Sequence, residues 1–291
     1  MGDTASSQRP PRVSILTLLE MKRAALPIAM LTAYDAPSGR LADEAGADVV
    51  LVGDSLGMVV LGYDSTLPVT LDDMLHHGRA VVRGVQRALV VVDMPFMTFQ
   101  VTAADALRNA GSILAETGAH AVKVEGGATI APTVRRLTEA GIPVMGHVGL
   151  TPQSVHQLGG FRVQAKDAQA ARRLRDDCLA LQDAGAFAVV LECIPAELAE
   201  VVSSQLTIPT IGIGAGVGCD GQVQVFHDIL GLGGSKSPRH AKRYAEIGSA
   251  MTQALGDYVA QVRGREFPGD EQSTRLDPAV HAEVLRSLEE G

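Results

Sequence analysis

The chain has few cysteines and no long apolar runs, and both shortages exclude classes of protein. Its three cysteines, Cys178, Cys193 and Cys219, are an odd number without a CxxC pair, which argues against a disulfide framework and against a zinc site. No run approaches the ~20 apolar residues of a membrane-spanning helix, and the N-terminus has no apolar stretch suited to a signal peptide. We therefore expect a protein of the reducing cytoplasm with no membrane partner.

Positive charge is also short. The chain has 25 Lys and Arg against 33 Asp and Glu, a formal net charge of −8. The basic residues are scattered along the sequence, and they do not form the basic stripe that would follow a phosphate backbone. We expect no nucleic-acid partner.

Apolar residues, by contrast, are in excess. They make up 46% of the 291 residues, and 31 glycines come in addition. The combined share exceeds the usual ~45–50% for that set. The surplus predicts apolar surface that is buried between subunits.

The length fits one large domain between two tails. Chains of 291 residues exceed the usual single-domain size, yet α/β barrels routinely reach ~250 residues as one domain. No internal linker is long enough to divide the chain. We expect a polar N-terminal tail at 1–14, a single catalytic domain at 15–268 and a charged C-terminal tail at 269–291.

Four segments repeat one order of features: an amphipathic helical pattern, a glycine and an apolar run. They are DEAGADVVLVGD (43–54), AETGAHAVKVEG (115–126), TEAGIPVMGHVG (138–149) and QDAGAFAVVLEC (182–193). Glycine tolerates the left-handed conformation that ends many helices. Each segment therefore predicts a helix joined directly to a strand.

The whole pattern predicts a closed barrel. Continuous apolar strands that alternate with helices indicate a parallel sheet, and seven or eight such units favour a (β/α)₈ TIM barrel over a doubly wound sheet. All strands of such a barrel point the same way, so their ends share the rim where barrel enzymes carry their chemistry. Strands are expected at 28–34, 49–54, 89–94, 121–125, 143–148, 188–193, 209–214 and 239–244, with a helix at 246–263.

Four of the apolar runs end in an acid, at Asp54, Asp93, Glu125 and Glu192. In a barrel these carboxylates converge, and converging carboxylates must take up protons, find cationic partners or hold a metal. Mg²⁺ suits them, because it prefers oxygen ligands and typically takes one or two protein carboxylates together with waters and substrate. The strand ends predict a magnesium site.

Two basic residues accompany the acids. Lys123 and Glu125 are two residues apart on one strand and share a face, so an inward Lys123 would neutralise the acids or hold an anionic substrate. His147 ends its strand at the same rim. Simpler interpretations stay open. A strand-end aspartate often forms a turn, and Lys123 could serve only to pair with Glu125.

The segment GIGAG (212–216) resembles a phosphate-binding loop.

A series of short blocks occurs in a fixed order from about residue 15 to 268. The blocks are TAYD (32–35), LVGDSLGM (51–58), DSTLPVT (64–70), DMPF (93–96), KVEGG (123–127), GHVGLTPQSV (146–155), GGFRVQ (159–164), LECIP (191–195), IPTIGIGAG (208–216) and DGQV (220–223). Together these blocks resemble the ketopantoate hydroxymethyltransferase family.

The resemblance implies a phosphoenolpyruvate/pyruvate-like TIM barrel with an N-terminal helical segment. It implies Mg²⁺-dependent transfer of a one-carbon unit from 5,10-methylenetetrahydrofolate to 3-methyl-2-oxobutanoate through a metal-stabilised enolate, giving 2-dehydropantoate for pantothenate biosynthesis. A cytoplasmic homodecamer is implied as well. Carried over by position, the metal centre falls on Asp54, Asp93 and Glu125 and the proton acceptor on Glu192. Asp54, Ser55, Asp93, Lys123 and His147 fall next to the substrate.

Two other functions fit parts of the pattern. A magnesium-dependent carbon–carbon lyase or mutase of the same barrel superfamily would share the enolate chemistry, although the chain has no Lys-Cys-Gly loop of the lyase kind. A non-catalytic assembly subunit would have lost site residues, and none is lost here.

The sequence departs from the family at VQAKD (163–167), where a Gly-Arg-rich turn is common, and we expect an effect on folate binding.

Overall fold

The computed structural model describes residues 11–233 and 238–290. The chain divides into two compact units, residues 1–244 and residues 245–291. The first unit holds the sheet and all the predicted site residues. Within the described residues, no helix is long and apolar enough to cross a membrane.

The first unit is a closed barrel of eight parallel strands, paired in chain order from β1 to β8 and back to β1. Seven predicted strands are present, each within two residues of its expected bounds. The strands are β1 (Ile28–Thr32), β2 (Val49–Val52), β3 (Leu89–Asp93), β4 (Ala121–Glu125), β5 (Val144–Gly149), β6 (Ala188–Glu192), β7 (Thr210–Ile213) and β8 (Gly221–Gln224).

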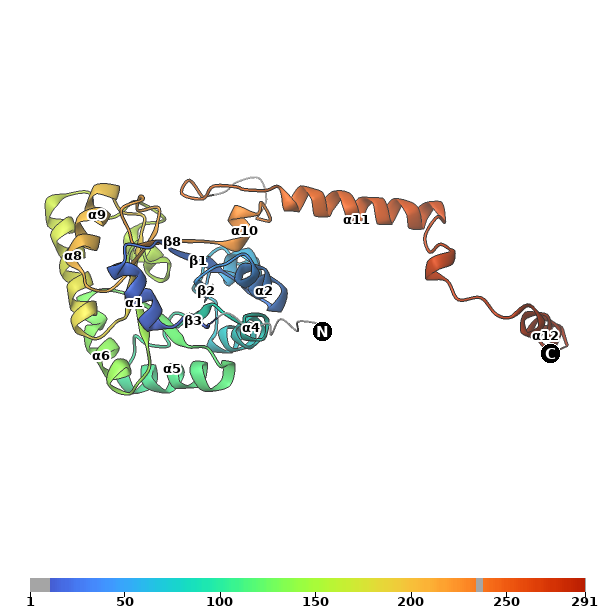
Figure 1. The fold of residues 1–291 in the computed structure, drawn as a ribbon, viewed down its shortest axis with the longest axis horizontal. Coiled ribbons are helices and arrows are strands. Elements are labelled where there is room, and N and C mark those ends of the chain that lie inside the picture. Colours follow the sequence, from blue (N-terminus) through green and yellow to red (C-terminus); the bar gives the residue numbers. More distant parts are fainter. Residues whose placement is uncertain (1–10, 234–237, 291) are drawn as a thin grey trace, which may run out of the picture. The chain divides into compact units, whose positions relative to one another are not determined.

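Helices surround the strands (Figure 1). Several begin at a side chain that accepts a hydrogen bond from the backbone of the first turn, which satisfies amide groups that have no partner within the helix. These residues are Ser14, Asp35, Thr70, Thr102 and Asp167. The helices are α1 (Ile15–Arg23), α2 (Ala36–Glu44), α3 (Leu56–Val59), α4 (Leu71–Gly84), α5 (Ala103–Thr117), α6 (Ala131–Glu139), α7 (Val155–Leu158), α8 (Ala168–Asp183), α9 (Ala196–Gln205) and α10 (Phe226–Ile229), with single 3₁₀ turns at η1 (Ala128–Ile130) and η2 (Pro152–Ser154).

Side chains alternate between two layers along the strands, as a period of two requires, and on β3 both layers are buried. On β3, Val90 and Val92 pack in the layer between strands and helices. Leu89 and Val91 pack inside the barrel. The next inward position on β3 is Asp93, so the inner face changes from apolar to charged at the C-terminal rim.

Helix α1 closes the N-terminal end of the barrel. Leu18 is fully buried in the same cluster as the inward side chains of the strands. The predicted N-terminal tail at 1–14 therefore includes ordered residues: Val13 is buried and Ser14 caps α1. Residues 1–10 of that tail lie outside the described residues.

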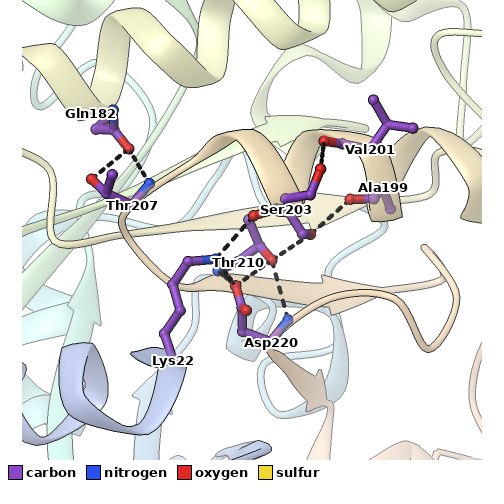
Figure 2. Close-up of polar contacts among 9 residues, drawn as sticks. Lys22, Gln182, Ala199, Val201, Ser203, Thr207, Thr210 and Asp220 are labelled. Atoms are coloured by element: carbon purple, nitrogen blue, oxygen red, sulfur yellow. Dashed lines mark hydrogen bonds and ion pairs between the residues drawn. The ribbon is translucent and has the colours of Figure 1, made fainter. Parts of the chain in front are cut away.

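A polar network ties α1 to the strands at this end (Figure 2). Lys22 Nζ lies 2.7 Å from Asp220 Oδ2 and donates to the Ser203 carbonyl at 3.0 Å. Thr210 donates to the same carboxylate oxygen from its backbone N at 2.8 Å and its Oγ1 at 2.9 Å. Ser203 Oγ lies 2.6 Å from Thr210 Oγ1. We call Lys22, Ser203, Thr210 and Asp220 the basal cluster.

The predicted eighth strand at 239–244 was wrong. Residues 239–244 form a turn and irregular backbone, and β8 is Gly221–Gln224, which pairs with β1 and β7. This strand is short, and its apolar side chains do not form a run. Gly221 also reflects close packing, because a Cβ there would lie 2.4 Å from the Ile28 carbonyl oxygen.

The second unit contains α11 (Ile247–Gly264), η3 (Asp270–Gln272) and α12 (Pro278–Glu289). The helix predicted at 246–263 is present as α11. The catalytic domain was expected to run to residue 268, whereas the barrel unit ends at Tyr244. None of the residues in α11 and α12 is buried.

Candidate active site

The C-terminal rim carries the predicted charged residues on the inner face of the barrel. Neighbouring strands place Asp93 beside Lys123, Glu125 beside His147, and Glu192 beside Gly149 in the strand register. Gly149 permits the approach of β5 to β6, since a Cβ there would lie 2.2 Å from the Glu192 carbonyl oxygen. Asp54 and Ser55 follow the end of β2. The expected convergence of the four acids at one rim is present.

Lys123 pairs with Asp93, not with Glu125 as the simpler interpretation supposed. Its Nζ lies 2.7 Å from Asp93 Oδ1, and the two side chains are 5% and 3% exposed. Residues two apart on a strand are about 6.6 Å apart, whereas adjacent strands are about 4.8 Å apart. Burial alone would lower the pKa of Lys123, but Asp93, Glu125 and Asp54 outweigh it and raise that pKa. Lys123 is therefore a firmly charged ammonium.

His147 lies between two acids. Its Nδ1 is 3.3 Å from Glu125 Oε1 and its Nε2 is 3.1 Å from Glu192 Oε2. Burial and the Lys123 charge lower the pKa of His147, but the two carboxylates outweigh both effects and raise it to about 9. Burial raises the pKa of Glu125, and the neighbouring His147 and Lys123 reverse this, so its pKa ends below the ordinary value. The imidazolium thus links the candidate metal ligand to the candidate base.

Asp54 is the acid least compensated by cations. Burial and then the charges of Asp93 and Glu125 raise its pKa well above the ordinary range. Burial also raises the pKa of Asp93, against the opposing effect of Lys123. The Asp54 backbone N donates to Asp93 Oδ2 at 3.0 Å, which joins the Asp54 main chain to the Asp93 carboxylate. Asp54 and Asp93 form a close pair of acids that repel one another when both are ionised.

Gln153 and Tyr34 belong to the site and were not predicted. Gln153, in η2 after β5, donates from its side-chain Nε2 to Asp54 Oδ2 at 2.9 Å and from its backbone N to Glu125 Oε2 at 2.9 Å. The Tyr34 hydroxyl lies 2.9 Å from Ser55 Oγ. Both residues stand inside the blocks TAYD and GHVGLTPQSV, but neutral polar side chains in loops carry no periodic signal.

The donor set suits a hard divalent cation. Among the described residues, no three His, Cys, Asp or Glu side chains already surround a common point as a finished metal site. Mg²⁺ does not require three, because it typically takes one or two carboxylates and fills its octahedron with waters and substrate. The buried pair Asp54 and Asp93 offers such oxygens, and the raised pKa of each reports a site that gains from added positive charge.

Two loops flank the acids at the rim. GIGAG begins with the last two residues of β7 and continues into the loop after it. Its Gly216 carbonyl accepts a hydrogen bond from Gln222 Nε2 at 2.9 Å. A phosphate-binding role for this loop stays a prediction. In the divergent VQAKD stretch, Gln164 N donates to the Cys193 carbonyl at 2.8 Å, next to Glu192. Ala165 has a φ of +54°, a conformation that favours glycine.

Solved structures that resemble the barrel share its fold. One is 2,3-dimethylmalate lyase, a PEP mutase/isocitrate lyase superfamily member, with a TM-score of 0.56 and 17% identity over 97% of this chain and 100% of that one. Another is phosphonopyruvate hydrolase in complex with oxalate and Mg²⁺, with a TM-score of 0.56 and 13% identity over 94% and 97%. These likenesses show the fold: a TIM barrel of eight parallel strands, here with charged residues at its C-terminal rim.

Sequence comparison gives the family. The family model described as ketopantoate hydroxymethyltransferase matches residues 12–270. A 3-methyl-2-oxobutanoate hydroxymethyltransferase of Gluconacetobacter diazotrophicus is 63% identical over 276 residues, 95% of this chain and 99% of the relative. One from Carboxydothermus hydrogenoformans is 57% identical over 269 residues, 92% and 98%. The chain belongs to the ketopantoate hydroxymethyltransferase family, and it is a transferase of hydroxymethyl groups.

Proposed function

We propose that the enzyme transfers a hydroxymethyl group from 5,10-methylenetetrahydrofolate to 3-methyl-2-oxobutanoate and forms 2-dehydropantoate, the first committed step of pantothenate biosynthesis. One observation carries the proposal beyond the family name: a buried pair of acids suited to Mg²⁺ lies on the same rim as a separate, more exposed acid. The Glu192 side chain is 14% exposed, against 4% for Glu125. Glu192 is therefore accessible to a substrate proton.

Asp54 and Asp93 would hold the magnesium ion, and Glu125, the third acid of the predicted metal centre, would lie beside it. When bound, the ion supplies a Lewis acid that makes the C3 hydrogen of a 2-oxo acid easier to remove. Lys123 and Ser55 bind the polar end of the 2-oxo acid, with Asp54, Asp93 and His147 around it. This arrangement leaves Glu192 free to accept a proton.

Glu192 accepts the proton from C3, and a positioned base typically contributes about 10²–10⁴-fold to the rate. C3 then forms a bond to the methylene carbon of the folate, and water supplies the hydroxyl as tetrahydrofolate leaves. His147 holds Glu192 through the contact at 3.1 Å.

The first test measures 2-dehydropantoate formation from the two substrates in Mg²⁺ and in excess EDTA. We expect EDTA to abolish product and added Mg²⁺ to restore it. Asp93→Ala and Glu125→Ala should each weaken Mg²⁺ binding in calorimetry while keeping the circular dichroism of a folded barrel. Full activity in excess EDTA would contradict the metal assignment.

The lyase or mutase alternative requires turnover without folate, so a reaction that proceeds equally without the folate would favour it.

We also propose that the protein is a cytoplasmic homodecamer with small-molecule substrates and no nucleic-acid or membrane partner. The apolar surplus supports self-assembly, and α11 adds an exposed apolar stripe of Ile247, Met251, Leu255, Tyr258 and Val262. Light scattering with a refractive-index detector should report a mass near ten times the 30.4 kDa of one chain. An active, stable monomer would refute the assembly.

A further inference from the structure

Gln153 contacts the site from outside the set of charged residues. It is 5% exposed and lies in the loop after β5, while its partners come from the ends of β2, β3 and β4. Its side-chain Nε2 donates to Asp54 Oδ2 at 2.9 Å and to the Met94 carbonyl at 3.0 Å. Its backbone N donates to Glu125 Oε2 at 2.9 Å. One residue thus connects two of the three candidate metal ligands.

The amide of Gln153 has only one orientation that satisfies its neighbours. Both Nε2 hydrogens are used by oxygens, and Oε1 accepts from Gln100 Nε2 at 3.0 Å. A flipped amide would present an oxygen to the Asp54 carboxylate and to the Met94 carbonyl. Gln100 is itself fixed, because its Oε1 accepts from the Phe99 backbone N at 3.3 Å. The chain of amides runs from the loop after β3 to the Asp54 carboxylate.

We propose that Gln153 is a positioning residue that sets the orientation of the Asp54 carboxylate toward Mg²⁺, and that Gln100 supports it by fixing its amide. The inference rests on the proposed function, in which Asp54 is a metal ligand. Groups that hold metal ligands in place commonly change metal affinity about 10–100-fold when they are replaced. Because Glu125 is held by the backbone N, a side-chain substitution at 153 acts on Asp54 and leaves the Glu125 contact in place.

The test compares Gln153→Met, Gln100→Met and Gln169→Met. Methionine has a similar length but cannot donate a hydrogen bond. Gln169 is exposed on α8, so its variant controls for the chemical change alone. Mg²⁺ binding to the EDTA-stripped protein is measured by calorimetry, and Mn²⁺ binding by electron paramagnetic resonance.

We expect Gln153→Met to weaken Mg²⁺ binding about 10–100-fold, Gln100→Met to weaken it by less, and Gln169→Met to leave it unchanged. In activity assays, the Mg²⁺ concentration for half-maximal rate should rise for Gln153→Met more than the rate at saturating Mg²⁺ falls. Thermal unfolding in EDTA checks that each variant is folded. If Gln153→Met does not fold, Gln100→Met carries the test, because it leaves Gln153 and Asp54 in place.

The outcomes distinguish failure of the positioning role from failure of the proposed function. If the wild type binds Mg²⁺ and Gln153→Met binds it equally well, the positioning role is overturned while the proposed function stands. The positioning role is overturned in the same way if Gln153→Met lowers only the unfolding temperature. If the wild type itself does not bind Mg²⁺, the metal step of the proposed function is overturned, and the role of Gln153 with it.

Discussion

The two ends of the barrel hold the same kind of ion pair in opposite surroundings. Lys22 and Asp220 at the N-terminal end and Lys123 and Asp93 at the C-terminal rim are each 2.7 Å apart. Around Asp220 the neighbours are neutral donors, the backbone and hydroxyl of Thr210. Around Lys123 the neighbours are further acids and a histidine. The basal pair is fully compensated by groups of the chain itself. The rim, by contrast, concentrates negative charge that a bound cation can neutralise.

The largest effect is expected at the rim, from Glu192→Gln. Glutamine keeps the size and hydrogen bonding of Glu192 but cannot accept the C3 proton. Exchange of the C3 hydrogen with D₂O, which needs no folate, should slow about 10²–10⁴-fold. Nuclear magnetic resonance of the 2-oxo acid measures the exchange, and calorimetry should show unchanged Mg²⁺ binding. A mutant that exchanged at the wild-type rate yet formed no 2-dehydropantoate would assign Glu192 to the transfer step instead.

A second experiment compares the two lysines directly. At pH 7 in EDTA, Lys123→Met leaves buried acids without their cation and should cost about 3–5 kcal/mol of unfolding free energy, with loss of substrate binding. Lys22→Met leaves Asp220 with the Thr210 donors and should cost about 1–2 kcal/mol, with wild-type Mg²⁺ affinity. Urea denaturation at fixed protein concentration measures both. If Lys22→Met impaired catalysis as much as Lys123→Met, the assignment of a structural role to the N-terminal end and a functional role to the C-terminal rim would be wrong.

The smallest effect concerns two histidines with opposite pKa shifts. His147 at the rim has a raised pKa of about 9, so its contribution to stability is complete below pH 6.5 and is lost as pH rises through about 9. His120, before β4, has a pKa lowered by burial and then by the Arg12 charge. Its contribution is present above pH 6.5 and is lost as pH falls through its folded pKa.

Urea denaturation in EDTA from pH 5 to 10 checks both signs. The stability difference between wild type and His147→Gln should shrink toward high pH, and that between wild type and His120→Gln should shrink toward low pH. His120 is about half-buried, so its effect will be reduced by solvent screening. Two differences that moved in the same direction with pH would contradict the assigned environments.

The sequence was informative where burial and charge coincide. Apolar runs that stop at Asp54, Asp93, Glu125 and Glu192 predicted both the strands and the rim. The partner of Lys123 was not predictable from spacing within one strand, because it depends on the register with β3. Gln153 gave no signal, since a neutral amide in a loop gains its role only from folding. The strand β8 was missed for a related reason. It closes the barrel with a short segment that contains a glycine and few apolar side chains, and it therefore has no apolar run.

The Lys22 to Asp220 contact also orders events in time. It joins residues 198 positions apart, so it forms only after nearly the whole barrel has been synthesised. At about 5–20 residues per second, α1 waits roughly 10–40 s on the ribosome for its partner. Until then α1 cannot close the N-terminal end of the barrel, and Leu18 has no completed core to pack into. The seam between the first and last strands is therefore where a nascent chain is most open to misassembly or to capture by chaperones.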